Sequence, residues 1–252
     1  IESSGVRLDV AVALEGALIP ALGLMRDDLR VAGVLPSFEP YSGLGFTSYP
    51  FGGETVFPTV LQRSGDQAPV DWVLVELRSA ADPSVIVDSH AGLVTRDLHV
   101  VGNDGVSPLS FRAAPGNYYV SVRHRNHLGC MTAAPIALGT SNVNNVQFTD
   151  PALTTYGTNA RKDMDGGTIK ALWMGNVTKN GNLKYTGTGN DRDPILLRVG
   201  SALPTNVVPG YFVEDCTMDG NVKYTGSGND RDPILVNVGS TTPNNVRVEQ
   251  MP

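Results

Sequence analysis

Residues 176–196 read NVTKNGNLKYTGTGNDRDPIL, and residues 215–235 read DCTMDGNVKYTGSGNDRDPIL. The two stretches are 39 residues apart, and their flanks align as well, with residues 172–174 (LWM) falling over residues 211–213 (YFV). Agreement of this density at a fixed offset indicates an internal repeat. We therefore expect the last third of the chain to contain two copies of one supersecondary unit.

The second copy begins with oxygen-bearing residues at alternate positions. Asp215, Thr217, Asp219 and Asn221 stand at the first, third, fifth and seventh places, and Gly220 stands at the sixth. This is the spacing of the first half of an EF-hand loop, where side-chain oxygens and one backbone carbonyl surround Ca²⁺ and the glycine permits a sharp turn. The pattern predicts a calcium site with Ca²⁺ as the cofactor.

The carboxylate that would close this loop arrives late. The twelfth position is Gly226 instead of an acid, and Asp230 and Asp232 follow the insert KYTGSGN. Asp232 precedes Pro233, and an Asp followed by a Pro is a favourable start for a helix, here of about two turns. One acid is expected to close the loop and the other to cap the helix, and the residues leave open which does which.

The first copy has the same spacing with fewer charges. Its candidate ligands are Asn176, Thr178, Asn180, Asn182, Asp191 and Asp193. Because two carboxylates of the second copy are amides here, we expect the 215–232 site to bind Ca²⁺ more tightly than the 176–193 site. The alternative is that these runs are turns held by side-chain to backbone hydrogen bonds. The recurrence of the whole cassette favours the calcium interpretation.

The paired cassette resembles a dockerin-type repeat, and more closely the C-terminal region of large secreted surface proteins of Bacteroidetes-type bacteria. The resemblance covers roughly residues 150–252 and extends upstream through RHRNHLG (123–129). It implies secretion, calcium binding and a bacterial cell-surface setting. Dockerins bind cohesin partners, so a cohesin-like protein is one candidate partner, although the insert and the missing twelfth acid depart from the dockerin pattern.

The first 150 residues carry the signals of β-strands. Apolar residues alternate with polar or small ones along 6–14, and 71–78, 85–101, 118–124 and 143–148 hold further strand patterns. We expect a break near Ala91 and Gly92, turns at 103–107 and 115–117, a short helix within 24–35 and a long loop over 36–60. On 71–78 we expect Val73, Val75 and Leu77 to lie on one face.

Six or so strands separated by turn signals predict a β-sandwich. The element PGNYYVSVRH (115–124) is similar to a strand of Cna-B-like and carboxypeptidase-regulatory-like sandwiches. The predicted fold is therefore mainly β, with an N-terminal β-sandwich over residues 1–150 and a small dockerin-like domain of two calcium loop–helix repeats over residues 151–252.

Aromatic side chains gather in the predicted loop over 36–60. They either cover an edge of the core or form a surface for carbohydrate stacking or self-association. They are Tyr41, Phe46, Tyr49, Phe51 and Phe57.

The two cysteines, Cys130 and Cys216, are either separate buried thiols or a bridge between the two halves of the chain. His124 and His127 lie three apart on a predicted strand, where their side chains would point to opposite faces and serve one metal poorly. The remaining histidines, His90 and His99, are isolated in the sequence, so all four are expected to have structural or surface roles.

The net charge of −6 and the sequence pI of about 5.1 give the chain no electrostatic attraction for nucleic acid or anionic lipid. No stretch approaches the roughly 18 to 20 apolar residues of a membrane span. The chain does not begin with Met and shows no signal peptide, as a mature processed form or an expression boundary would.

No catalytic motif is recognisable. The sequence lacks the G-x-S-x-G elbow, the Walker loop, G-x-G-x-x-G and the HExxH zinc motif. We therefore expect a non-catalytic extracellular structural protein: a subunit or terminal module of a cell-surface adhesin or self-assembling fibre, with strand addition from the N-terminal strand as the means of assembly. The alternatives are a module that binds glycans or a cohesin-like protein, and a hydrolase with a pair of acids.

Overall fold

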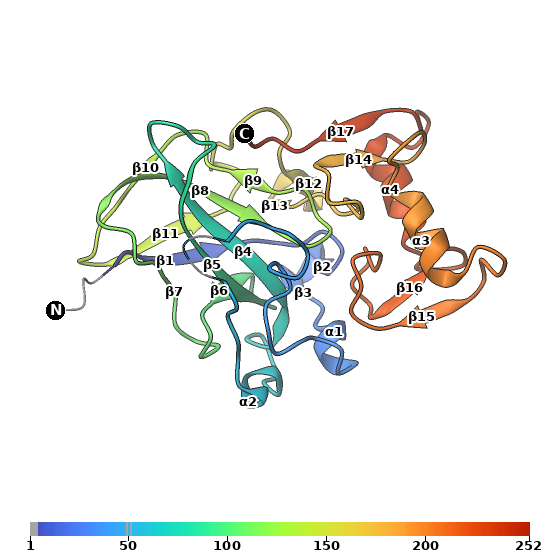
Figure 1. The fold of residues 1–252 in the computed structure, drawn as a ribbon, viewed down its shortest axis with the longest axis horizontal. Helices are drawn as coiled ribbons and strands as arrows, with labels where there is room; N and C mark the ends of the chain where they lie inside the picture. The colour runs from blue at the N-terminus through green and yellow to red at the C-terminus, as the bar shows by residue number, and fades with distance from the viewer. Residues whose placement is uncertain (1–4, 49, 51) are drawn as a thin grey trace.

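The fold is mainly β, as the sequence predicts, and it centres on one large sheet (Figure 1). The computed structural model describes residues 5–48, 50 and 52–252. Seven strands follow one another across this sheet, while β7 (Leu109–Ser110) pairs with β1 and β9 (Cys130–Met131) with β8. In sheet order the seven are β10 (Ile136–Leu138), β8 (Gly116–Arg123), β4 (Pro69–Ser79), β5 (Ile86–Thr95), β6 (His99–Val101), β1 (Arg7–Ala11) and β11 (Val143–Gln147).

The longest strand of the sheet is β4, which pairs antiparallel with β5 on one side and with β8 on the other. Ten of its eleven residues are buried, so the strand is covered on both faces, and Val73, Val75 and Leu77 lie on one of them as predicted. A strand covered on both faces must pair its charges internally. Glu76 and Arg78 do so, with 2.8 Å between carboxylate and guanidinium.

The expected break near Ala91 and Gly92 was wrong, because both residues lie inside the unbroken strand β5. A Cβ atom on Gly92 would lie only 2.7 Å from the carbonyl oxygen of Val101 and from the side chain of Leu109. The glycine therefore marks a close approach of neighbouring chain instead of a turn. The chain turns later, between β5 and β6, where Leu98 has a φ of 74°.

The alternating segment at the N-terminus forms β1, and its apolar residues are buried as predicted. This strand is not at an edge of the sheet: it pairs parallel with β11 and antiparallel with β6 and β7. Over its described length it is therefore held in its own sheet and not free to join a neighbour's sheet, as strand addition from the N-terminus would require. The edges of the sheet are β10 and β11.

Short elements complete this part of the molecule. The predicted helix within 24–35 is one turn, α1 (Asp28–Val31), and the loop over 36–60 runs into a second one-turn helix, α2 (Pro58–Leu61). The others are β2 (Leu18–Ile19), η1 (Pro20–Leu22), β3 (Leu24–Met25), β12 (Lys162–Met164), η2 (Asp165–Gly167) and β13 (Ile169–Ala171).

The two copies of the repeat exchange strands with each other (Figure 1). The strand of the first copy, β14 (Asn182–Lys184), pairs with β17 (Val246–Val248), which follows the second copy. The strand of the second copy, β16 (Asn221–Lys223), pairs with β15 (Val207–Pro209), which follows the first. The helices α3 (Arg192–Val199) and α4 (Arg231–Val238) cross over in the same way, because α3 packs on β16 and α4 on β14.

Side-chain hydrogen bonds between the two copies are reciprocal in the same way. Thr186 Oγ1 donates to the carbonyl of Pro243 at 3.2 Å, and its equivalent Thr225 Oγ1 donates to the carbonyl of Pro204 at 3.1 Å. Each copy thus completes its partner's sheet, and neither copy can bury its apolar face alone.

Two apolar cores correspond to the two parts of the fold. One contains the buried residues of the large sheet and extends to Leu172 and Met218, and the other contains Leu128 with the other buried apolar residues of the repeat from Val177 to Val238. Cys130 belongs to the first core and Cys216 to the second, and both are free thiols. None of the helices in the described part of the chain has the length and apolar character that crossing a membrane would require.

The aromatic residues of the 36–60 loop divide between core and surface. Tyr41 is fully buried and donates its hydroxyl to the carbonyl of Trp72 at 2.6 Å, with Phe46 packed edge-on against its ring. Phe57 is 78 % exposed. Tyr49 and Phe51 lie outside the described residues. The loop is thus anchored through Tyr41, which is not available for stacking on a ligand.

Candidate metal centre

The backbone of each candidate loop turns sharply at its glycine. Gly181 and Gly220 have φ values of 72° and 81°, which glycine alone adopts without strain. Lys179 and Met218, two residues earlier, share a φ of 58°. Two copies of a strained backbone at equivalent positions indicate that the loop conformation is specified and not incidental.

Two buried carboxylates meet at the side chain of Thr217 in the second copy. Asp230 Oδ1 accepts hydrogen bonds from Thr217 N at 2.9 Å and from Thr217 Oγ1 at 3.0 Å, and Asp230 Oδ2 accepts one from Lys223 N at 2.8 Å. Thr217 Oγ1 is also 3.4 Å from Asp215 Oδ1. Both carboxylate residues have no exposed surface.

The carboxylate of Asp215 is turned into its own loop. Its two oxygens accept the N–H groups of Asp219 at 3.2 Å and of Gly220 at 2.9 Å. A carboxylate offers about four lone-pair sites, so these bonds leave acceptor capacity on both acids.

Burial makes the charge of these acids costly. It raises the pKa of Asp215 to about 6, and burial together with the charge of Asp215 raises the pKa of Asp230 to about 7. A bound cation would supply the missing counter-charge and reverse both shifts.

The other predicted ligands of the second copy do not converge with this pair. Asp219 forms an ion pair with Lys223 Nζ at 2.5 Å, and the Asn221 side chain donates back to the carbonyl of Asp219 at 3.2 Å. Consequently the described residues contain no group of three or more acidic, His or Cys side chains placed to hold a metal. For this loop to bind calcium, Asp219 would have to break its ion pair with Lys223 and coordinate the ion instead.

The choice between the two late acids is resolved by position. Asp230 closes the loop, whereas Asp232 points outward, pairs with Arg231 at 2.7 Å and accepts a hydrogen bond from Asn229 Nδ2 at 2.7 Å. The helix begins at Arg231, two residues before Pro233, so Asp230 holds the N-cap position and Asp232 lies in the first turn. Asp230 makes no side-chain capping bond to the helix, and Asn229 Oδ1 accepts the N–H of Asp232 at 2.9 Å.

The first copy repeats this arrangement with one charge fewer at its centre. Asp191 is buried, accepts Thr178 N at 2.9 Å, Thr178 Oγ1 at 2.8 Å and Lys184 N at 2.8 Å, and burial raises its pKa to about 6. The residue equivalent to Asp215 is Asn176, whose buried Oδ1 has no partner among the described residues. An unpartnered buried oxygen and a buried carboxylate within one loop are donors of the kind that a hard cation prefers.

The remaining candidates of the first copy lie outside this centre. The N–H of Asn182 donates to Asn180 Oδ1 at 2.8 Å, which closes a turn between these two residues. Asp193 matches Asp232: it is mostly exposed and pairs with Arg192.

No protein-family model, curated protein or solved structure matches this chain.

A buried polar network beside the second loop was not predicted. β8 ends at Arg123, so His124 and His127 are not on one strand as expected, and their Nδ1 atoms are 2.9 Å apart. His124 Nε2 lies 3.0 Å from Asp71 Oδ2, and His127 Nε2 accepts the N–H of Gly16 at 3.2 Å. These contacts fit two neutral imidazoles, because His127 Nε2 must carry no proton in order to accept.

The electrostatics of this network follow from its burial. Burial, together with the charge of Arg125, lowers the pKa of His127 well below its ordinary value of 6.5. Burial alone would raise the pKa of Asp71, but Arg125 and His124 hold it at about 2. The charged groups of this network are Arg125 and Asp71, which form an ion pair with 2.9 Å between Nε and Oδ2, and the two imidazoles are neutral.

The same network connects the sheet to the calcium-type loop. Asn126 Nδ2 donates to the carbonyls of Val213 at 3.0 Å and Asp215 at 2.7 Å, and Arg125 donates to the carbonyl of Phe212. Tyr211 donates its hydroxyl to Asp71 Oδ1 at 2.6 Å. The start of the second loop is therefore held by side chains of the large sheet and the segment after β8.

Proposed function

We propose that this chain is a non-catalytic, secreted, calcium-stabilised structural module, and that it serves as a subunit or terminal module of a bacterial cell-surface adhesin or extracellular fibre. In this proposal residues 151–252 form a dockerin-like pair of calcium loops, and the large sheet forms a β-sandwich-like domain upstream. The observation that carries it is the pair of buried acids, Asp215 and Asp230, that share Thr217 as a hydrogen-bonding partner.

The donor chemistry supports calcium over other metals. The residues that would hold it are Asp215, Thr217, Asp219 and Asp230 through their side chains and Asn221 through its backbone carbonyl, all of them hard oxygen ligands. In the first copy the corresponding set is Asn176, Thr178, Asn180, Asn182 and Asp191. When bound, the ion would neutralise the buried carboxylates and cross-link the loop. With three carboxylates, the second loop suits the weak range of extracellular modules, a dissociation constant of about 10⁻⁴ to 10⁻³ M.

The place of the loop in the fold supports a stiffening role. Asp230 immediately precedes α4, and α4 packs on β14 of the other copy. Asp215 is joined to the large sheet through Asn126. A cation that draws Asp215 and Asp230 together would therefore fix the repeat against the sheet.

For assembly, the edges of the sheet replace the N-terminal strand as the sites of strand addition. β10 and β11 each present one unpaired side within the described residues. An exposed edge pairs readily with a strand of another chain.

Calcium binding is tested by titration calorimetry on chelator-stripped protein. The wild-type protein should take up Ca²⁺, and Asp215→Asn should lose the tighter site while Asp193→Asn, which changes an outward-facing acid, should retain it. Chelation should lower the melting temperature of the wild type. Absence of heat and of any melting shift in millimolar Ca²⁺ would overturn the proposal. Assembly is tested separately by electron microscopy of concentrated protein, and a strictly monomeric, calcium-insensitive protein would argue against the fibre.

A further inference from the structure

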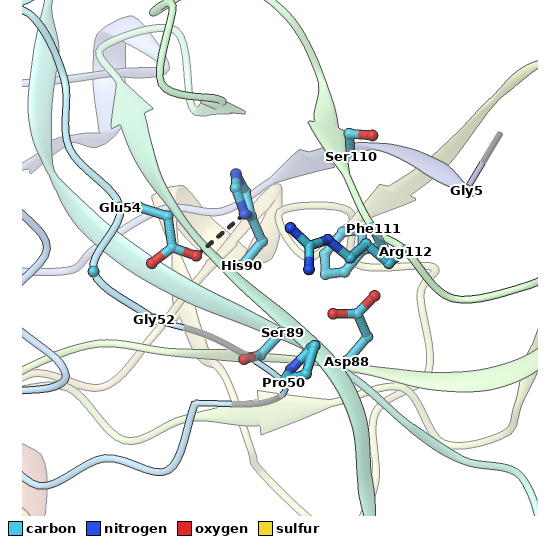
Figure 2. Close-up of a pocket in the computed structure, with 11 residues that line it drawn as sticks. Gly5, Pro50, Gly52, Glu54, Asp88, Ser89, His90, Ser110, Phe111 and Arg112 are labelled. Atoms are coloured by element: carbon cyan, nitrogen blue, oxygen red, sulfur yellow. Dashed lines mark ion pairs between the residues drawn. The ribbon is translucent and has the colours of Figure 1, made fainter. Parts of the chain in front are cut away.

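A cleft of about 650 Å³ opens on the large sheet among β5, the residues after β7, the chain before β1 and the end of the 36–60 loop (Figure 2). Its described lining comes from residues 5–112, so it shares no residue with the calcium-type loops. The volume is in the range of small-molecule sites, about 300–1,000 Å³.

Polar side chains from separate segments converge in this cleft. Asp88 and His90 stand two apart on β5 and therefore project from the same face. Glu54 reaches His90 from the loop, with 3.2 Å between its Oε1 and the imidazole Nδ1, and also accepts the N–H of Ala91 at 3.3 Å. Figure 2 shows the Asp88 carboxylate, the His90 imidazole and the Arg112 guanidinium pointing into the same space.

These side chains are held in position. Asp88 is 4 % exposed and its Oδ2 accepts the N–H of Ala113 at 2.9 Å, which leaves its other oxygen for a further donor. The ring of His90 packs edge-on against Phe111, with centroids 6.2 Å apart. Glu54 is fixed by His90 and the backbone, and these hydrogen bonds lower its pKa although burial acts to raise it. Fixed side chains bind a ligand without the entropic cost of ordering them.

The balance of charge selects the class of ligand. Glu54 and Asp88 are acids and Arg112 is the one lining cation, so the described lining does not favour an anion such as phosphate or a uronate. Carboxylate acceptors, guanidinium and imidazole donors and the hydroxyls of Ser89 and Ser110 together suit a ligand with many neutral hydroxyl groups.

We infer that this cleft binds a neutral saccharide, as a free sugar or as the terminal residue of a glycan. The inference does not rest on the calcium loops. It would give a surface or fibre module its point of attachment to a neutral glycan.

The test is saturation-transfer NMR with free glucose, galactose, mannose, xylose and N-acetylglucosamine, followed by titration of the sugar that binds best. At least one neutral sugar should bind with a dissociation constant near the millimolar range. Asp88→Asn, which can keep the acceptor for Ala113, and Arg112→Gln should each weaken binding by about tenfold or more. His90→Gln is a third variant, should either of these fail to fold.

The matched control is a second acid–histidine pair in a smaller cleft, where His99 Nδ1 lies 2.8 Å from Asp9 Oδ1. His99→Gln should leave sugar binding unchanged, and so should Asp215→Asn, which separates this inference from the calcium proposal. Failure of every neutral sugar to bind at tens of millimolar, preferential binding of glucuronic acid, or equal losses in the His99 and Asp88 variants would overturn it.

Discussion

Comparing Asp230→Asn with the matched control Asp191→Asn separates two contributions to the free energy of unfolding: the charge of the second loop and the hydrogen bonds that its buried acid accepts. Both carboxylates accept the same three bonds, from a threonine N–H, the same threonine hydroxyl and a lysine N–H, at 2.8 to 3.0 Å. The amide keeps one acceptor and turns a donor towards an N–H group. Each substitution should therefore cost about 1–3 kcal/mol of unfolding free energy from the hydrogen bonds alone.

The two variants differ in the residue at the first position of their loop. Asp230 is exposed to the charge of Asp215, whereas the first copy has the neutral Asn176 at the position equivalent to Asp215. The pKa of Asp230, about 7, is higher than that of Asp191, about 6, which is the direction that repulsion from Asp215 predicts. In chelator, at a pH above both values, Asp230→Asn relieves this repulsion and should cost less unfolding free energy than Asp191→Asn.

In calcium the order should reverse. An ion at a concentration one hundred times its dissociation constant stabilises the folded state by about 2.7 kcal/mol, and Asp230→Asn should remove most of that from the tighter site. The assay is urea unfolding followed by circular dichroism, for both variants and the wild type, with and without Ca²⁺. If the difference between the two variants is the same in calcium and in chelator, the coupling between these acids and an ion is refuted.

Three further predictions follow from particular contacts. The pKa of His127 is lower in the folded state than in the unfolded state, so the free energy of unfolding should be highest above pH 6.5 and fall as the pH drops below it. In urea unfolding, His127→Gln should reduce the slope of this free energy against pH by up to about 1.4 kcal/mol per pH unit, whereas the control His99→Gln should not. Equal slopes in the two variants would contradict a neutral His127. Asn176→Asp should raise the calcium affinity of the first loop in calorimetry, and unchanged affinity would count against the charge argument. Ile195→Ala and Ile234→Ala, both fully buried at equivalent places, should each cost about 2–5 kcal/mol, and clearly unequal costs would contradict the reciprocal packing of the copies.

Features that depend on residues close together in the chain can be predicted from the sequence. The two copies are visible because they share a cassette at a fixed offset, and the glycines at the sixth position of each loop have the positive φ that the motif predicts. Strands β1, β4, β8 and β11 follow from alternation or β-branched runs, and the mainly β class follows from them.

Features that depend on distant pairing were not accessible. The spacing of the repeat does not predict that β14 pairs with β17, which follows the second copy, instead of with β15, which follows its own copy. The neutral pair of His124 and His127 forms because β8 ends one residue before His124, and strand ends are the least certain part of any sequence pattern. The contact between Glu54 and His90 joins a loop to a strand 36 residues away, so the cleft could not be foreseen.

Which of Asp230 and Asp232 closes the second loop depends on where the first turn of the helix begins. Asp230 immediately precedes the helix and is buried, whereas Asp232 is the second residue of the helix and points outward. The sequence offers either acid as the helix start, and the position of that start decides the face that each acid presents.

A crystal structure of the protein grown in millimolar Ca²⁺ tests the central claim most directly. The account predicts an ion between Asp215 and Asp230, with oxygen ligands at about 2.3–2.6 Å and Asp219 released from Lys223 to reach it. A map that shows no ion in the second loop, with Lys223 still bound to Asp219 and the two buried acids held by backbone N–H groups alone, would contradict it.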